Sequence, residues 1–378
     1  MTERRVGVWL FGARGSVATT TIAGAAALRH GGAPVGLVTE TPAFAGAGLV
    51  PTDQLVFGGH DIVETPLTKR LESLVAGGVL PHGIESLVRA DLAATEPDVV
   101  TVMDRQVSQF EQVEQWAADI RAFAERHALE SVAAINVAST EAPHPHQPSH
   151  DDVGALRHAL TGGGDVLAAS SLAALAAFEA GASYVDFTPS NSIRPAAVRQ
   201  WAADRGLPYG GQDAKTGETL VKSVLAPMFS ARALQVHAWS GTNLLGGGDG
   251  ATLADPRTAQ SKNTSKERGL SDLIGDVAGE VHIDYVDPMG DWKTAWDHIV
   301  FSGFLGVRMT MQFTWQGCDS ALAAPLVLDL ARLSAAALDR GHVGAMPFLG
   351  FYFKDPVDST EHSLVRQYDE LLRWVREC

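Results

Sequence analysis

Short apolar runs alternate with longer helical stretches through the first half of this chain, and this alternation limits the folds available to it. A first apolar run, Val6 to Phe11, ends at a glycine-bearing turn and is followed by a helical stretch from Val17 to Arg29. Such an alternation predicts a parallel sheet with helices on both faces. Further strands are expected at Val35 to Val38, Asp98 to Val102, Ser131 to Val137 and Ser183 to Phe187, and helices at Gln109 to Glu125 and Leu167 to Ala180.

The pattern changes after Ala231. Strands are expected at Gln235 to Ser240, Glu280 to Tyr285 and Phe304 to Thr314, and the last alternates apolar and polar residues, which is typical of an antiparallel sheet with one exposed face. From Ala321 the chain reads as helix again. We therefore predict an α/β fold: a Rossmann-like doubly wound parallel sheet at residues 1–230 and 318–378, with a second α+β domain on an open, largely antiparallel sheet inserted at residues 231–317.

The composition of the chain limits the kinds of partner that it can bind. The 378 residues carry a formal net charge of −15, which argues against nucleic acid or an anionic membrane surface as a partner, because those are bound through surplus Lys and Arg. The two cysteines, Cys318 and Cys378, form no disulfide framework, as expected in a reducing compartment. The apolar stretches are interrupted by charged residues or proline, so no membrane span is predicted. We expect a soluble cytoplasmic protein whose partner is a small molecule.

A turn for a dinucleotide follows the first strand. Gly12, Gly15 and Ala18 form G-x-x-G-x-x-A between the strand and the helix, where glycines allow a sharp turn and close approach of a pyrophosphate to the helix N-terminus. The next strand is expected to end at Thr39 and Glu40, and no basic residue follows closely, which favours NAD over NADP. Asp61, in the loop from Phe57 to Ile62, is a second carboxylate that could bind a ribose hydroxyl.

A segment rich in proline and histidine lies at Glu141 to Asp152. His144, His146 and His150 could converge on a metal ion. A solvated loop stiffened by proline is the favoured interpretation, because proline spacing separates side chains as often as it gathers them. We predict no metal site.

Lysines and acids gather in polar motifs of the second half. Lysine is scarce in this chain, so lysines placed in turns with glycine and aspartate point to a local anion rather than to solubility. Lys262 and Lys266 are four residues apart, which alone would indicate a solvated helix face. The motifs are GGQDAKTGETLVKS (210–223), LLGGGDG (244–250), QSKNTSK (260–266), GDWKTAWD (290–297), CDSALAAPL (318–326) and FYFKDP (351–356).

These motifs, in this order, resemble those of the inositol-3-phosphate synthase family, also called myo-inositol-1-phosphate synthase, in its compact prokaryotic form. The resemblance runs from the glycine turn to FYFKDP. It implies an NAD-dependent isomerase that converts glucose 6-phosphate to 1D-myo-inositol 3-phosphate in inositol and phospholipid biosynthesis. It also implies a homotetramer assembled through the sheet of the second domain.

The resemblance implies site residues as well. The family's active-site lysines and acids fall on Lys262, Lys266, Lys293, Lys354, Asp213 and Asp319. Cofactor contacts are implied at Gly12, Ala13, Arg14, Gly15, Ser16, Asp61, Ser139 and Asp249, and phosphate contacts at Thr216, Gly217 and Lys293. On chemical grounds we expect Lys266, backed by Asp213, to move the O5 proton, and Lys262 and Lys354 to stabilise oxyanions on O5 and O1, although the roles of these lysines could be exchanged.

The chain departs from the family pattern at several positions. Ala13 and Arg14 stand where the family carries paired asparagines, and Gly247 and Gly248 replace two further asparagines. Glu218 replaces a glutamine and Thr216 a serine. These departures leave two alternatives open: a related cyclase or epimerase acting on another sugar phosphate in a specialised cyclitol pathway, or a non-catalytic paralogue that binds NAD or a sugar phosphate.

Overall fold

A computed structural model describes residues 4–102, 107–142, 144–246 and 277–377. Its larger part is a seven-stranded parallel sheet in the order β11-β6-β5-β4-β1-β2-β3. The chain adds β2 and β3 on one side of β1 and the later strands on the other side, so the strand order reverses beside β1. This confirms the Rossmann-like expectation. The strands are β1 (Val6–Phe11), β2 (Leu55–Asp61), β3 (Val99–Thr101), β4 (Ser131–Asn136), β5 (Ser183–Asp186), β6 (Pro208–Gly211) and β11 (Gly344–Ala345).

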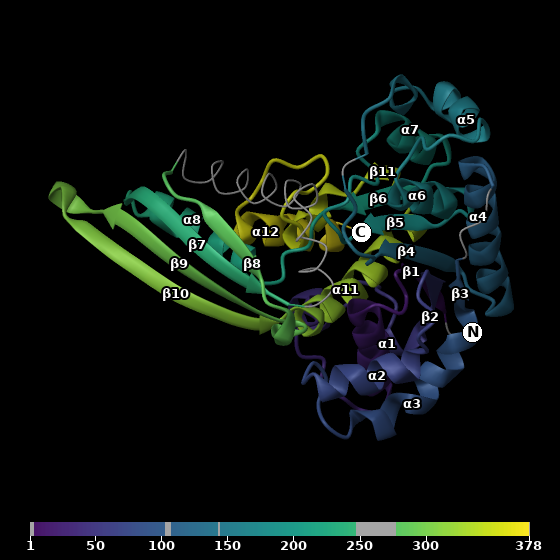
Figure 1. Cartoon of the computed structure of the whole chain (residues 1–378), viewed down its shortest axis with the longest axis horizontal. Helices are drawn as coiled ribbons and strands as arrows, with labels where there is room; N and C mark the ends of the chain where they lie inside the picture. The colour runs from purple at the N-terminus through teal and green to yellow at the C-terminus, as the bar shows by residue number, and fades with distance from the viewer. Residues whose placement is uncertain (1–3, 103–106, 143, 247–276, 378) are drawn as a thin grey trace.

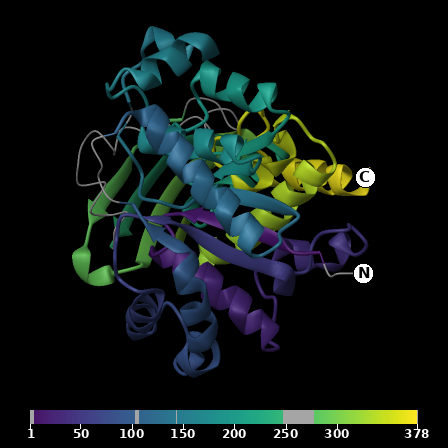
Figure 2. The same ribbon diagram turned by 90° about the vertical axis from the view of Figure 1, so that its right-hand side faces the viewer.

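Helices cover both faces of this sheet (Figures 1 and 2). One face packs against α1 (Ser16–Arg29), α2 (Leu67–Ala76), α3 (Ile84–Thr95) and α11 (Asp319–Asp339). The other packs against α4 (Gln109–Arg126), α5 (Val153–Thr161), α6 (Ala169–Glu179) and α7 (Ala196–Asp204), and in Figure 2 α4 crosses in front of the sheet. Every residue of β1 is buried, as expected for a strand with helices on both sides.

The helix α11 returns the chain from the second sheet to the first. Among the described residues it is the one helix whose length and apolar composition would suffice to cross a bilayer, but 72% of that apolar stretch is buried inside the protein. It also carries Asp329, which accepts hydrogen bonds from the backbone N–H groups of Val38 and Thr39. Buried, hydrogen-bonded charges of this kind mark a core helix.

The second sheet is smaller and reaches away from the helical body (Figure 1). Its order is β10-β9-β7-β8, antiparallel except for the parallel pair of β7 and β8. One face packs under α8 (Glu218–Ala231), where Ala226 and Phe229 meet Trp239, Ile299 and Phe301. The strands are β7 (Gln235–Leu245), β8 (Val281–Tyr285), β9 (Trp292–Ser302) and β10 (Arg308–Cys318).

Three expected elements differ from the structure. Val35 to Val38 is not a strand: the chain turns there, and Val38–Glu40 forms a short 3-10 helix. The strand that follows α1 is β2, at Leu55–Asp61, which the sequence analysis treated as a loop. The strand expected from Phe304 begins instead at Arg308, after a turn at Phe304–Gly306.

Candidate active site

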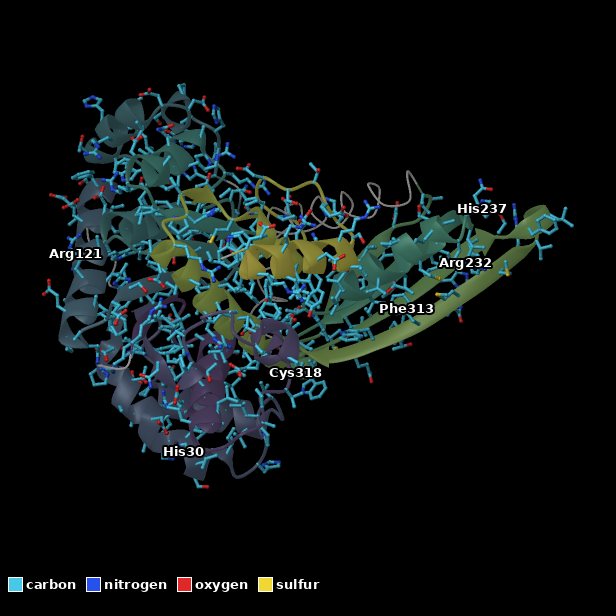
Figure 3. All side chains as sticks on the ribbon, turned by 180° about the vertical axis from the view of Figure 1, so that it is seen from behind. His30, Arg121, Arg232, His237, Phe313 and Cys318 are labelled. Atoms are coloured by element: carbon cyan, nitrogen blue, oxygen red, sulfur yellow. The ribbon has the colours of Figure 1, made fainter. Side chains whose placement is uncertain are left out.

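One large cavity lies between the carboxyl ends of the parallel strands and the base of the second sheet. Its volume is about 1060 Å³, and both sheets line it. In a parallel sheet the carboxyl ends of the strands share one edge, so the turns after β1, β2, β4 and β5 all open into the same space. Figure 3 labels Cys318 where β10 reaches the helical body, and the next residue, Asp319, lines the cavity.

The turn after β1 is shaped to lie close to a ligand. Gly12 has φ +89°, and a Cβ there would come within 2.7 Å of the Ala138 Cα on the turn after β4. Its N–H donates to the His60 carbonyl at 2.8 Å. Gly15 precedes α1 and supplies no side-chain cap, so the first N–H groups of the helix have no side chain from that position in front of them. This arrangement fits a pyrophosphate, and Ser16 and Ser139 line the same part of the cavity.

Asp61 ends β2 beside this turn. Its Oδ2 accepts a hydrogen bond from the Arg14 N–H at 2.6 Å, and its Oδ1 accepts one from the Val63 N–H at 2.9 Å. A carboxylate held at the end of the second strand is placed to accept from an adenosine ribose hydroxyl. Asp61, and not Glu40, therefore ends the second strand, because Glu40 lies in the 3-10 helix and pairs with Arg332.

Arg14 directs its guanidinium away from the pyrophosphate turn. Nη2 donates to Glu96 Oε1 at 2.8 Å and to the Val99 carbonyl at 3.2 Å, and Nη1 donates to Thr101 Oγ1 at 3.2 Å. The side chain is buried and ties the ends of β1 and β3 together. A contact of Arg14 with the cofactor would therefore use its backbone, and Ala13, fully buried, would likewise contribute backbone only.

Lys354, which is partly buried, and Asp213, which is buried, form an ion pair 141 residues apart in sequence. Lys354 Nζ donates to Asp213 Oδ1 at 2.7 Å, and the Lys354 N–H donates to the Asp213 carbonyl at 2.7 Å. Antiparallel pairing of the two loops fixes both ends, including a bridge between Ala214 and Phe353. Asp213 is 3% exposed, and within the described residues nothing donates to its Oδ2. Asp213 lines the cavity, and a buried carboxylate oxygen without a donor can accept from a further group.

Lys293 forms a second cationic group with Asp319 and Thr216. Its Nζ contacts Asp319 Oδ1 and donates to Thr216 Oγ1 at 3.0 Å, while Thr216 Oγ1 donates to Asp319 Oδ1 at 2.8 Å. Asp319 begins α11, two residues before the expected start of this helix at Ala321. Gly217 packs so close that a Cβ would lie 2.9 Å from Lys293 Cε and 3.0 Å from Trp315 Nε1. The loop before α8 thus brings its backbone directly onto the lysine.

Two further donors stand in register beside Lys293, and the sequence analysis missed both. Asn243 on β7 and Trp315 on β10 each pair with Ala295 on β9, so the three residues form one row across the sheet. Asn243 Nδ2 and Trp315 Nε1 are buried atoms with no acceptor among the described residues, and both residues line the cavity. Together with Lys293 and the loop at Gly217 they suit a polyanionic group such as a phosphate.

A cluster of buried charges lies next to these donors, at the row of the second sheet where Gly241 pairs with Asp297. Lys222 Nζ contacts Glu218 Oε1 and lies 3.5 Å from Asp297 Oδ1, which also accepts from Trp239 Nε1 at 2.6 Å. Burial, followed by the nearby charge of Glu218, raises the pKa of Asp297 to about 6, against the opposing effect of Lys222. Gly241 makes room for the cluster, since a Cβ there would come within 3.2 Å of Asp297 Oδ1.

Other predicted positions have different outcomes. Lys262, Lys266 and Asp249 lie outside the described residues, so their predicted roles stay predictions. The histidines of the Pro-rich loop bind separate partners: His146 lies 3.2 Å from Asp151 and His150 lies 2.7 Å from the Val166 carbonyl. In the described ranges no cluster of His, Cys, Asp or Glu is arranged to hold a metal.

Comparison with known proteins decides the family. A family model described as myo-inositol-1-phosphate synthase, with an NAD-binding domain, matches residues 41–376. The chain belongs to this family. Inositol-3-phosphate synthase 1 of Bacteroides thetaiotaomicron is 32% identical over 98% of this chain and 93% of its own length. Inositol-3-phosphate synthase of Trypanosoma brucei brucei is 35% identical over 60% of this chain and 45% of its own length.

Solved structures show the same fold. Inositol-3-phosphate synthase of Caenorhabditis elegans matches with a TM-score of 0.88 at 22% identity, over 99% of this chain and 86% of that one. A myo-inositol-1-phosphate synthase-related protein of Thermotoga maritima matches with a TM-score of 0.79 at 23% identity, over 99% of both chains. NAD is the cofactor of the present protein, as a member of the myo-inositol-1-phosphate synthase family. The turn at Gly12 and the carboxylate of Asp61 fit NAD.

Proposed function

We propose that this protein is an inositol-3-phosphate synthase, an isomerase that uses NAD to cyclise glucose 6-phosphate to 1D-myo-inositol 3-phosphate. The observation that carries the proposal is the convergence of a dinucleotide turn, the Lys354–Asp213 pair and the Lys293 group on one cavity. A redox cofactor beside fixed ammonium groups and a phosphate site is what an oxidation, aldol closure and reduction of one sugar phosphate need.

The residues around Lys293 would bind the phosphate. The donors come from three strands and one loop: Asn243 Nδ2, Lys293 Nζ, Trp315 Nε1 and the backbone near Gly217. A phosphate dianion could exchange its water for these fixed N–H groups. Binding the phosphate, which does not react, would hold the sugar carbons at the cofactor edge. The nicotinamide, when bound, supplies a hydride acceptor that later returns the hydride.

The Lys354–Asp213 pair would act at the reacting oxygens. Negative charge develops on O5 during enolisation and on O1 during ring closure, and an ammonium group held by a buried carboxylate would stabilise it without reorganising. Asp213 Oδ2, with no donor in the described part of the chain, supports a role for this carboxylate in orienting a second group that moves the O5 proton. We assign that proton transfer to Lys266, and a second oxyanion contact to Lys262.

The quaternary and domain organisation are part of the same proposal. We propose domains at residues 1–230 with 318–378 and at 231–317; α8, which ends at Ala231, packs on the second sheet. We also propose a homotetramer assembled through the second sheet. The side chain of Trp296, which is 47% exposed on the face of β9 opposite α8, supports an interface there. A cytoplasmic location and a role in inositol and phospholipid biosynthesis complete the proposal.

The decisive experiment is an assay of the purified protein with glucose 6-phosphate and NAD⁺. We expect inositol phosphate to form without net production of NADH, because the hydride returns to the sugar. A product only from another sugar phosphate would overturn the substrate assignment. Binding of NAD⁺ and glucose 6-phosphate with no product from any sugar phosphate would instead indicate a non-catalytic binding protein.

A further inference from the structure

An arginine with spare hydrogen-bonding capacity stands at the ribose end of the cofactor site. Arg70 lies on α2, and its Nε donates to the Arg14 carbonyl at 3.1 Å. The N–H of the same Arg14 donates to Asp61 Oδ2 at 2.6 Å. Asp61 and Arg70 therefore flank one residue of the glycine turn. We call Asp61, the Arg14 backbone and Arg70 the ribose corner.

One face of α2 points Arg70 into the cavity. Arg70, Ser73, Leu74 and Gly77 follow helical spacing, and all four line the cavity. Arg70 is half-buried, so its orientation is limited by the helix and by the bond to Arg14. Within the described residues its two terminal nitrogens have no hydrogen-bond or ion-pair partner.

The other charges at this corner are already paired. The Arg14 guanidinium is bound to Glu96 Oε1 at 2.8 Å, and Glu96 Oε2 accepts from the Leu67 N–H at 2.7 Å. Lys69, the residue before Arg70, points outward and pairs with Glu72 at 2.9 Å. In the described residues this leaves Asp61 and Arg70 as the two charges of the corner that a ligand can engage.

We propose that Arg70 is a cofactor-binding residue able to pair with a phosphate on the adenosine 2′-oxygen, and that Asp61 is what excludes such a phosphate. A carboxylate at the end of the second strand accepts from a 2′-hydroxyl but repels a 2′-phosphate, whereas an arginine nearby accommodates that phosphate. The corner contains both groups, so its selectivity for the unphosphorylated dinucleotide depends on the Asp61 charge. The absence of a basic residue has no part in it.

The proposal rests on the proposed cofactor site and not on the sugar chemistry. Its test therefore measures binding alone, by calorimetry without any sugar phosphate. The ligands are NAD⁺, NADP⁺, 5′-ADP and 2′,5′-ADP. The variants are Asp61→Asn, Arg70→Gln and the two combined, and Lys69→Gln is the matched control because it removes a neighbouring positive charge that faces solvent.

We expect the unchanged protein to bind NAD⁺ more tightly than NADP⁺. Asp61→Asn should raise the affinity for NADP⁺ and 2′,5′-ADP by about tenfold or more, the size measured for close charge pairs at interfaces. The combined variant should lose that gain, and Lys69→Gln should change nothing. Equal NADP⁺ affinity in Asp61→Asn and the combined variant would overturn the role of Arg70.

A second pattern would place Arg70 elsewhere. If Arg70→Gln weakens 5′-ADP and NAD⁺ as strongly as 2′,5′-ADP, Arg70 contacts the pyrophosphate and the proposal is wrong. Asp61→Asn loses one acceptor for a backbone N–H, so Asp61→Ser and thermal unfolding of each variant accompany it. Should both Asp61 variants unfold, Arg70→Gln in the otherwise unchanged protein still decides: it must weaken NADP⁺ more than NAD⁺.

Discussion

The two sheets of this protein serve the site in different ways. The parallel sheet is buried on both faces, and its contribution to the cavity is an edge of turns shaped by backbone, as at Gly12. The second sheet is covered on one face only, and β10 alternates exposed and partly buried residues along most of its length. Its contribution is a set of side chains, Asn243, Lys293 and Trp315, aligned in rows on the covered face.

Because of this difference, we expect substitutions to impair cofactor binding and phosphate binding in different ways. The pyrophosphate turn, which is made of backbone, is sensitive to added atoms, whereas side-chain charge acts in this half of the site at Asp61 and Arg70. A phosphate site made of side-chain donors is sensitive to the loss of single groups. The Lys354–Asp213 pair lies in loops of the first sheet but consists of charged side chains, like the phosphate site. Variants of this pair therefore test whether turnover can be lost without loss of cofactor binding.

The largest effect is expected for Lys354→Ala. Loss of a preorganised ammonium group should lower kcat/KM for glucose 6-phosphate by about 10²-fold or more. NAD⁺ affinity should stay unchanged, because the lysine pairs with Asp213 and not with the glycine turn. Steady-state kinetics and an NAD⁺ titration measure the two properties, with the exposed Lys69→Ala as the control. Parallel losses of turnover and NAD⁺ affinity would contradict the division between the two regions.

The next effect tests the backbone cradle through Gly12→Ala. Gly12 has φ +89°, and its new Cβ would meet the Ala138 backbone at 2.7 Å. Gly31 is the matched control, because it has φ +87° and no atom of the described residues would lie within 4 Å of a Cβ there. Both variants should lose about 1 kcal/mol or more to left-handed backbone strain. Gly12→Ala alone should also weaken NAD⁺ binding, by roughly tenfold or more, since the turn must shift away from the pyrophosphate.

The outcome is read from NAD⁺ titrations at matched temperatures below both melting points. Similar NAD⁺ affinities for Gly12→Ala and Gly31→Ala would show that the close approach to Ala138 does not shape the site. Glucose 6-phosphate binding, measured without cofactor, should be unaffected by either change.

Much of the first sheet can be predicted from the sequence, and the reason is burial on both faces. Val6–Phe11 is a strand with the predicted bounds because an apolar run ended by a glycine has few alternatives. The second strand was missed because the residues near its carboxyl end, Gly58, Gly59 and His60, show no strand pattern. Their conformation is set by the adjacent strands: a Cβ at Gly59 would lie 2.1 Å from the Leu10 carbonyl oxygen. The second strand was instead predicted at Val35 to Val38, because that stretch is an apolar run.

The site shows the same limit. Motif strings pointed to Lys293, Lys354, Asp213 and Asp319, and the structure brings them to one cavity. They did not show that Lys354 pairs with Asp213 or Lys293 with Asp319, since such partners are set by how loops meet across the fold. Trp315 was invisible because a tryptophan in an alternating strand usually packs, and only the sheet register places its N–H beside Asn243.

A smaller effect is expected for Trp315→Phe. This change removes the Nε1 donor and keeps an aromatic ring, so the KM for glucose 6-phosphate should rise roughly tenfold for one lost hydrogen bond to an anion. NAD⁺ affinity should not change. Trp296→Phe is the control, since Trp296 is 47% exposed on β9. An unchanged KM in Trp315→Phe would remove the tryptophan from the phosphate site.

The last comparison concerns pH, and it takes one buried acid from each sheet. Asp186, at the end of β5, has a pKa raised from 3.8 to about 7 by burial, against hydrogen bonds from Ser192, Thr188 and Asn136. Asp297, on β9, has a pKa raised from 3.8 to about 6 by burial, against the charge of Lys222. Each folded pKa lies above its unfolded value, so each acid's contribution to stability is fully present below about pH 4 and is lost as pH rises through the folded pKa.

Asparagine at either position should remove that dependence. We expect the free energy of unfolding of the unchanged protein to fall relative to Asp297→Asn between about pH 4 and 6, and relative to Asp186→Asn between about pH 4 and 7. The slope of each difference is at most about 1.4 kcal/mol per pH unit. Urea unfolding over this range measures it, and other acids cancel because all three proteins share them. Curves that stay parallel for Asp297→Asn alone would mean that Lys222 fully offsets the effect of burial in the second sheet. At Asp186 the groups that oppose burial are hydrogen-bond donors, so the pH dependence should remain there.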